Sequence, residues 1–278
     1  MSADGSTLVA NANGMNDQSY DLRQDAGVIA SVAQGTWNFG AVYPDGSLVL
    51  QCRGGQIPGT GDVGVSRLYD TKTGLAFAAP GFDGVVSSAL MPSFSPDGKK
   101  IAFSNFDTGQ GHSLSVMSFD VKSKTFSGLT DITSTADTTN WLGWPAFLPT
   151  SSAFLFGNID GQDFATWEQH HGDLSVADVA TRMVAPLDAL NGGAPGQVYL
   201  PYGDSEAHLN YEPTVLPVAV GGYYWTIFTS RREYGNTTSA ARASAGRGAR
   251  EAREMGALRW CAWLRPRRVA RRSKRSAA

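Results

Sequence analysis

The residues best suited to chemistry lie in short polar segments of the chain. Asp204, Glu206 and His208 alternate, so an extended segment would place their side chains on one side. Carboxylate and imidazole groups are ordinary ligands of divalent cations. A solvated loop explains the same three residues without a metal, and we therefore predict no metal site.

Two further polar groups have simpler explanations. His170 and His171 are adjacent in a polar insertion, and adjacent side chains of an extended chain point in opposite directions, which favours a surface loop. Asn158, Asp160 and Asp163 only faintly resemble a calcium loop and fit ordinary turn chemistry better.

The sequence contains none of the short motifs that mark common enzyme classes. G-x-S-x-G, H-E-x-x-H, the P-loop and G-x-G-x-x-G are all absent. We therefore assign no catalytic residue and no cofactor. Cys52 and Cys261 form neither a disulfide framework nor a metal site, and Cys52 is expected to be a buried thiol.

The elements that must position these polar segments are strands joined by a recurring turn. Pro96-Asp97-Gly98 is turn chemistry, and Ile101 and Phe103 then alternate with Ala102 at the period of a strand. Equivalent turn positions fall at Asp4, Asp45, Asp97, Thr150 and about Ala219, in steps of 41, 52, 53 and about 69 residues. Repeats of this length with about four strands each predict a β-propeller.

The predicted fold is all-β, with four-stranded antiparallel blades, about three complete and two partial. Residues 1–36 supply the last three strands of a blade, three full blades span about 37–85, 88–134 and 140–200, and residues 210–236 supply two strands. Stacked blades bury both sheet faces. The following residues are therefore expected in the core: Phe94, Ile101, Phe103, Phe147, Phe154 and Phe156.

The segment from Ser95 to Phe103 resembles the WD40-like (PD40) repeat of TolB-type propellers, and Val42–Leu50 and Ala3–Ala10 are similar to it. The resemblance covers about residues 1–236. It implies that the Pro-Asp-Gly turn joins the first two strands of a blade. It also implies a periplasmic or cell-surface location, although no signal peptide is recognised in this chain. Family propellers close with six or seven blades, so this resemblance implies an incomplete ring.

Propeller topology predicts which face carries function. Loops between second and third strands, and segments between blades, open on the face away from Pro96-Asp97-Gly98. Ligand sites are commonly built from such loops on a rigid scaffold. The predicted binding residues on this face are Arg53, Asn105, Asp107, Asn158, Asp160, Asp204, Glu206, His208 and Arg231.

Charge divides the chain into an acidic body and a basic end. From Arg242 onward the net charge is +10, whereas residues 1–240 carry −12. The acidity argues against nucleic acid as a partner of the body. For residues 237–278 the Ala/Arg-rich composition favours a disordered or frameshift-derived tail over a tail that binds nucleic acid or membrane.

These observations predict a non-catalytic scaffold that binds a protein, peptide or glycan outside the cytoplasm of a bacterium. The alternative is the propeller part of an enzyme, either a peptidase-gating domain or a propeller lyase or hydrolase. No apolar run is long enough for a transmembrane segment. Exposed blade faces would favour self-association.

Overall fold

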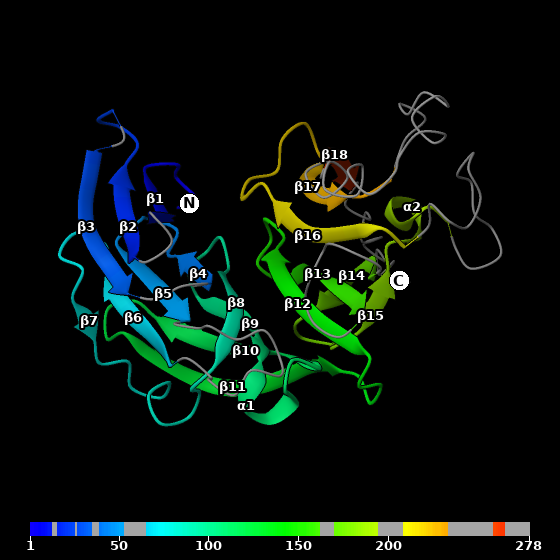
Figure 1. Cartoon of the computed structure of the whole chain (residues 1–278), viewed down its shortest axis with the longest axis horizontal. Coiled ribbons are helices and arrows are strands. Elements are labelled where there is room, and N and C mark those ends of the chain that lie inside the picture. Colours follow the sequence, from blue (N-terminus) through cyan, green and yellow to red (C-terminus); the bar gives the residue numbers. More distant parts are fainter. Residues whose placement is uncertain are drawn as a thin grey trace, which may run out of the picture.

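The computed structural model describes residues 1–12, 16–25, 27–34, 39–52, 65–161, 170–193, 208–232 and 258–264. Their strands form five antiparallel sheets whose members follow one another in chain order. The sheets succeed each other around a curved path, with β4, β8 and β12 on its inner side (Figure 1). This is the arrangement of propeller blades, so the predicted fold class is confirmed.

Three of the sheets have four strands. The first contains β4 (Phe39–Val42), β5 (Leu48–Cys52), β6 (Ser66–Asp70) and β7 (Ala76–Phe77). The second contains β8 (Ala89–Phe94), β9 (Lys100–Asn105), β10 (Ser113–Asp120) and β11 (Thr125–Ser134), with the helical turn α1 (Phe106–Gly109) after β9. The third contains β12 (Asn140–Phe147), β13 (Ala153–Asp160), β14 (His171–Asp178) and β15 (Val184–Pro186), followed by α2 (Asp188–Asn191).

The other two sheets have three strands. One contains β1 (Thr7–Ala12), β2 (Asn16–Asp21) and β3 (Gly27–Gln34). The other contains β16 (Asn210–Val215), β17 (Tyr224–Ser230) and β18 (Leu258–Leu264).

Strand β18 corrects the prediction that the last sheet has only two strands. It pairs with β17 along its full length, from Tyr224 opposite Leu264 to Ser230 opposite Leu258. This pairing satisfies backbone groups of β17 that would otherwise form an open sheet edge. The strand lies inside residues 237–278, where the sequence predicted a tail without strands. The other residues of that range lie outside the described part.

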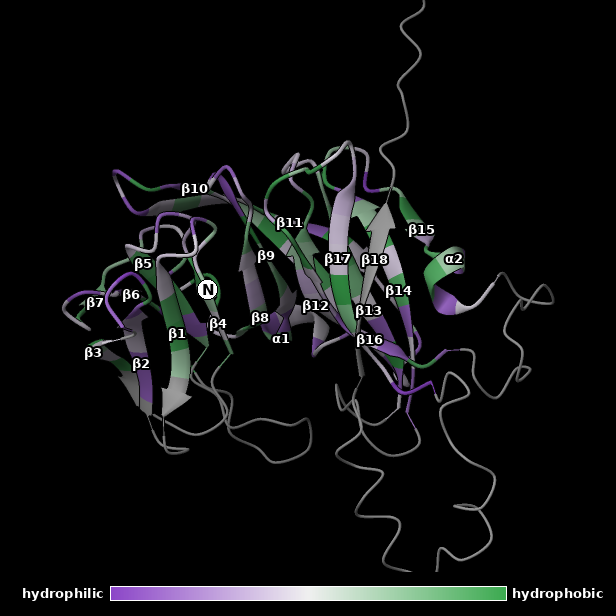
Figure 2. Cartoon of the chain, turned by 90° about the horizontal axis from the view of Figure 1, so that it is seen from above, coloured by the Kyte–Doolittle hydropathy of each residue, from purple (hydrophilic) through white to green (hydrophobic). Residues whose placement is uncertain are grey.

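The core is built from both faces of the sheets, as the blade model predicts. Ile101 and Phe103 pack in a cluster with residues of β5, β6 and β10, whereas Ala102 packs with residues of β12 and β13. All six aromatic and aliphatic residues predicted for the core are buried. Figure 2 shows that much of the hydrophilic sequence lies in turns and loops at the strand ends.

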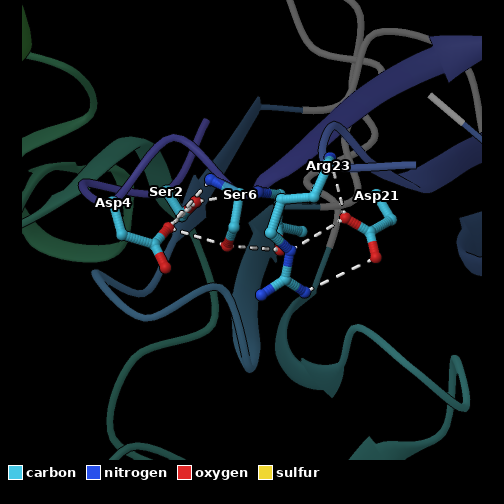
Figure 3. Close-up of polar contacts among 6 residues, drawn as sticks. Ser2, Asp4, Ser6, Asp21 and Arg23 are labelled. Atoms are coloured by element: carbon cyan, nitrogen blue, oxygen red, sulfur yellow. Dashed lines mark hydrogen bonds and ion pairs between the residues drawn. The ribbon is translucent and has the colours of Figure 1, made fainter. Parts of the chain in front are cut away.

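The recurring turn has one geometry in three sheets. Gly5, Gly46 and Gly98 have φ values of 72°, 78° and 69°, a region that favours glycine. An aspartate one residue earlier accepts a backbone hydrogen bond from the residue after the glycine, at 2.9 Å in Asp4 and 2.8 Å in Asp45. Figure 3 shows the Asp4 turn, where the Ser2 and Ser6 hydroxyls also donate to Asp4 Oδ1.

These turns contact one another from blade to blade at one end of the strands. The amide of Asp97 donates to the Ser151 hydroxyl at 3.1 Å, and the amide of Asp4 donates to the Pro44 carbonyl at 3.3 Å. A Cβ atom at Gly98 would collide with the Tyr43 hydroxyl. The turns therefore stabilise the packing of neighbouring blades. The opposite ends of the strands do not contribute to these turn contacts.

A second recurring feature lies in the first strand of three sheets. Met91, Trp144 and Glu212 each have φ between 47° and 57°, each precedes a proline, and each lies at a register shift with the neighbouring strand. These positions are β-bulges, which bend a strand locally. The ring of Trp144 contacts that of Phe39 edge-on at 5.4 Å, so apolar side chains of β4 and β12 meet on the inner side of the arc.

Candidate polar binding cleft

Polar side chains from three strands and one inter-sheet segment line an open cleft of about 240 Å³ at one end of the third sheet. The cleft is formed by the start of β12, the end of β13, the start of β14 and His208, two residues before β16. The lining residues are Asn140, Asn158, Asp160, His171, Gly172, Asp173 and His208.

Strand register brings five of these side chains together. Asp160 lies opposite Asn140 on one side and opposite His171 on the other, so the three form a row across β12, β13 and β14. Asn158 and Asp173 are opposite each other in the next row with the same side-chain direction. Residues directly opposite in antiparallel strands have Cβ atoms about 5 Å apart. The row is therefore fixed by backbone pairing.

The sixth side chain comes from the neighbouring sheet. Leu209 pairs with Gly172 in a parallel bridge, and the Gly172 amide donates to the His208 carbonyl at 2.6 Å. This brings the His208 Nδ1 atom within 2.7 Å of Asp173 Oδ2. Gly172 is required here because a Cβ atom would collide with the Tyr211 ring.

Buried groups hold the wall of the cleft in place. The fully buried Tyr211 donates its hydroxyl to the His170 carbonyl at 2.6 Å, and Arg231 donates to the same oxygen at 3.3 Å. The indole of Trp141 donates to the Gly161 carbonyl at 3.0 Å, directly after Asp160. The strand ends that carry the polar side chains are thereby anchored to the core cluster of Trp141, Ile159 and Tyr211.

The cleft offers mainly hydrogen-bond acceptors. The described residues that line it include two carboxylates and no Lys or Arg. Within the described part of the chain, the Asp160 carboxylate makes no hydrogen bond or ion pair. Asn158 Oδ1 and Asp173 Oδ1 are buried and receive no hydrogen bond. These two atoms are out of contact with solvent, so the unpaired acceptor that the cleft presents to a ligand is the exposed Asp160 carboxylate, which favours a group that donates hydrogen bonds.

The cleft lacks the groups of a nucleophilic active site. The His208–Asp173 pair has the geometry by which a carboxylate orients an imidazole base. However, the lining residues within the described part of the chain include no Ser, Thr, Cys, Lys or Tyr. The described part of the chain also contains no group of three or more His, Cys, Asp or Glu side chains arranged to hold a metal ion.

Three of the nine predicted binding residues line this cleft, namely Asn158, Asp160 and His208. Arg231 lies behind it, on the His170 carbonyl. Arg53, Asp204 and Glu206 lie outside the described residues, so the alternating triad predicted from the sequence is represented by His208 alone.

Asn105 and Asp107 lie elsewhere and have internal partners. The buried Asn105 accepts hydrogen bonds from the amides of Asp107 and Thr108 at the start of α1 and donates to Ser115. Asp107 accepts from the amides of Ser87 and Ser88, which connects α1 to the segment before β8. Both residues therefore organise the loop after β9.

Sequence reasoning did not select Asn140, His171 or Asp173 as binding residues. His171 and Asp173 alternate at the start of β14, which is a weak signal by itself. Their significance depends on the pairing of β14 with β13, which aligns His171 with Asp160 and Asp173 with Asn158. Matching polar residues across predicted hairpins would have been the signal to use.

The chain was compared with known proteins. No protein-family model matches it, and no curated protein matches its sequence. Among solved structures, TolB from Acinetobacter baumannii is 14% identical with a TM-score of 0.44, and the match covers 82% of this chain and 50% of that one. An oligogalacturonate lyase from Vibrio parahaemolyticus is 14% identical with a TM-score of 0.45, covering 81% of this chain and 56% of that one.

A third similar structure is the β-propeller domain of Cps50 (Swd1) from Myceliophteria thermophila. It is 12% identical with a TM-score of 0.44, and the match covers 83% of this chain and 64% of that domain. The chain thus spans about half of the length of the TolB structure that it matches. Among the described residues, no helix has the length and apolar character needed to cross a membrane.

Proposed function

We propose that this chain is a non-catalytic propeller scaffold that binds a protein, peptide or glycan ligand in the polar cleft. The observation that carries the proposal is the convergence of polar side chains from β12, β13 and β14 beside His208, among them the exposed Asp160 carboxylate, which has no partner. The cleft lies at the opposite ends of β12 and β13 from their connecting turn at Leu148–Ser152. An eight-residue strand separates the two by roughly 25 Å.

The proposed location is the periplasm or surface of a bacterial cell, which follows from the resemblance to TolB-type propellers. The alternative function is the propeller part of an enzyme, and the His208–Asp173 pair is the observation that favours it. We favour a scaffold because none of the described residues that line the cleft carries a nucleophilic hydroxyl, thiol or amine.

The test is a screen of the full chain against peptide and glycan arrays, followed by measured affinities for each hit. We expect His171→Ala to weaken binding to the selected ligand, because His171 lies in the row of cleft residues. The control is Lys99→Ala, which changes an exposed residue in the turn between β8 and β9 of the neighbouring sheet and should leave binding unchanged. Equal affinity of both variants and the unmodified chain would show that the ligand binds elsewhere.

A further inference from the structure

We infer that the cleft binds the cationic end of one Lys or Arg side chain presented by a peptide ligand. This inference rests on the proposed binding function and specifies the group that is recognised. The first support is charge: Asp160 and Asp173 line the cleft, and the described residues that line it include no Lys or Arg.

The second support is the supply of acceptors. The exposed Asp160 carboxylate has no partner, whereas Asp173 is already paired with His208 through its Oδ2 atom. An ammonium group donates three hydrogen bonds and a guanidinium group donates five, and neither accepts any. Hydrogen bonds between ionised donors and carboxylates are stronger than neutral ones. A cationic side chain therefore matches the unpaired Asp160 carboxylate at the cleft.

The third support is size. Pockets that enclose a drug-sized molecule are about 300–1,000 Å³. This cleft is smaller, at about 240 Å³, and it is open to solvent. It therefore accommodates the end of a side chain whose peptide backbone remains outside. The fixed positions of Asp160 and Asp173 in paired strands preorganise the acceptors, which lowers the entropic cost of binding.

The test uses a short capped peptide with a single Arg, and the same peptide with citrulline, which is neutral and similar in shape. Binding to the full chain is followed by NMR shifts of backbone amides. We expect saturable shifts at Asp160, Gly172 and Asp173 with the Arg peptide, weaker at high salt. The citrulline peptide should produce none. Equal shifts with both peptides would overturn the inference.

Variants locate the interaction. Asp160→Asn keeps the shape of the side chain but removes its charge. We expect this change to lower the affinity for the Arg peptide about fivefold. Asp25→Asn makes the same change at an exposed turn near β3 with φ of 51°, a conformation that Asn tolerates, and should have no effect. Unchanged affinity of Asp160→Asn would refute the inference. If array ligands still lose affinity with His171→Ala in that case, the proposed binding function stands without it.

Discussion

At the residue scale, aspartates perform two different tasks in this protein. Asp4 lies in a turn, where hydrogen bonds from the Ser2 hydroxyl and then from Ser6 lower its pKa to about 2. Asp160 has no such donors and faces the cleft. Cys52 is a structural residue, because burial raises its pKa to about 11 and keeps its thiol protonated at neutral pH. An aspartate whose carboxylate already accepts internal hydrogen bonds therefore serves the fold, whereas one without such bonds is available to a ligand.

The Asp4 turn predicts a pH dependence of stability. Because the folded pKa lies below the unfolded value, the charged form stabilises the fold above about pH 4. This contribution is lost as the pH falls from about 4 to about 2. We expect Asp4→Asn to be less stable than the unmodified chain at pH 7 and the difference to shrink over that range. Urea unfolding at each pH measures it.

Asp25→Asn is the control for this experiment, because it removes the same charge at an exposed turn. A stability difference between Asp4→Asn and the unmodified chain that stays constant from pH 7 to pH 2 would contradict the assignment to Asp4 ionisation.

At the element scale, a second type of turn recurs between third and fourth strands. Asp70, Asp120 and Asp178 each accept hydrogen bonds from the amides two and three residues later. The residue four positions after the aspartate has a left-handed conformation in each case. Gly74 occupies it in the first turn, but Lys124 and Arg182 occupy it in the others, with φ of 56° and 59°. The latter two turns therefore carry backbone strain.

Arg182→Gly is expected to stabilise the protein. Glycine relieves the strain of the left-handed conformation, but its greater flexibility in the unfolded chain offsets part of this gain. The net increase in the free energy of unfolding is about 0.5–1 kcal/mol. The melting temperature should rise by roughly 2 °C. Arg182→Ala removes the same charge but retains the Cβ atom, so it should give no gain. A lower melting temperature for Arg182→Gly than for Arg182→Ala would contradict the explanation.

At the scale of the whole molecule, blade packing leaves one sheet face exposed. In β17, Thr226 and Phe228 are buried, whereas Trp225 and Ile227 are 38% and 42% exposed. Exposed apolar side chains also occur in the preceding hairpin, at Leu216, Val218 and Val220. Contiguous exposed apolar side chains are typical of surfaces where proteins associate, and we propose that role for this face. It lies on a different sheet from Asp160 and therefore forms a separate surface.

This face predicts self-association of the chain. We expect a concentration-dependent rise in mass in analytical ultracentrifugation, and Ile227→Thr should reduce it because it replaces an exposed apolar group in the centre of the face. Val85→Thr makes a similar change at an exposed apolar residue away from this sheet and should not affect the mass. A chain that remains monomeric at all concentrations would disprove the proposed association.

The local chemistry of the sequence was sufficient to predict the blades. Asp-Gly turns and the alternation of strands depend on residues that are two or three positions apart. Their recurrence along the chain predicted the number of sheets and the residues of the core. The degraded fourth copy followed the same rule: Ser151 takes the left-handed position of the glycine, with φ of 57°. The strand β18 was missed because its pairing with β17 crosses a long stretch of chain without a turn motif.

Local patterns did not predict the cleft as a unit. Asn158 and Asp160 were selected from their loop, but their neighbours His171 and Asp173 depend on the register between β13 and β14. His208 reaches Asp173 only because Leu209 pairs with Gly172 in the adjacent sheet. The sequence by itself therefore determined the strands, turns and buried residues, which depend on short-range backbone chemistry. Only the tertiary structure decided which polar residues meet. Strand register and blade packing bring together residues that are distant in sequence, such as Asp173 and His208, which are 35 positions apart.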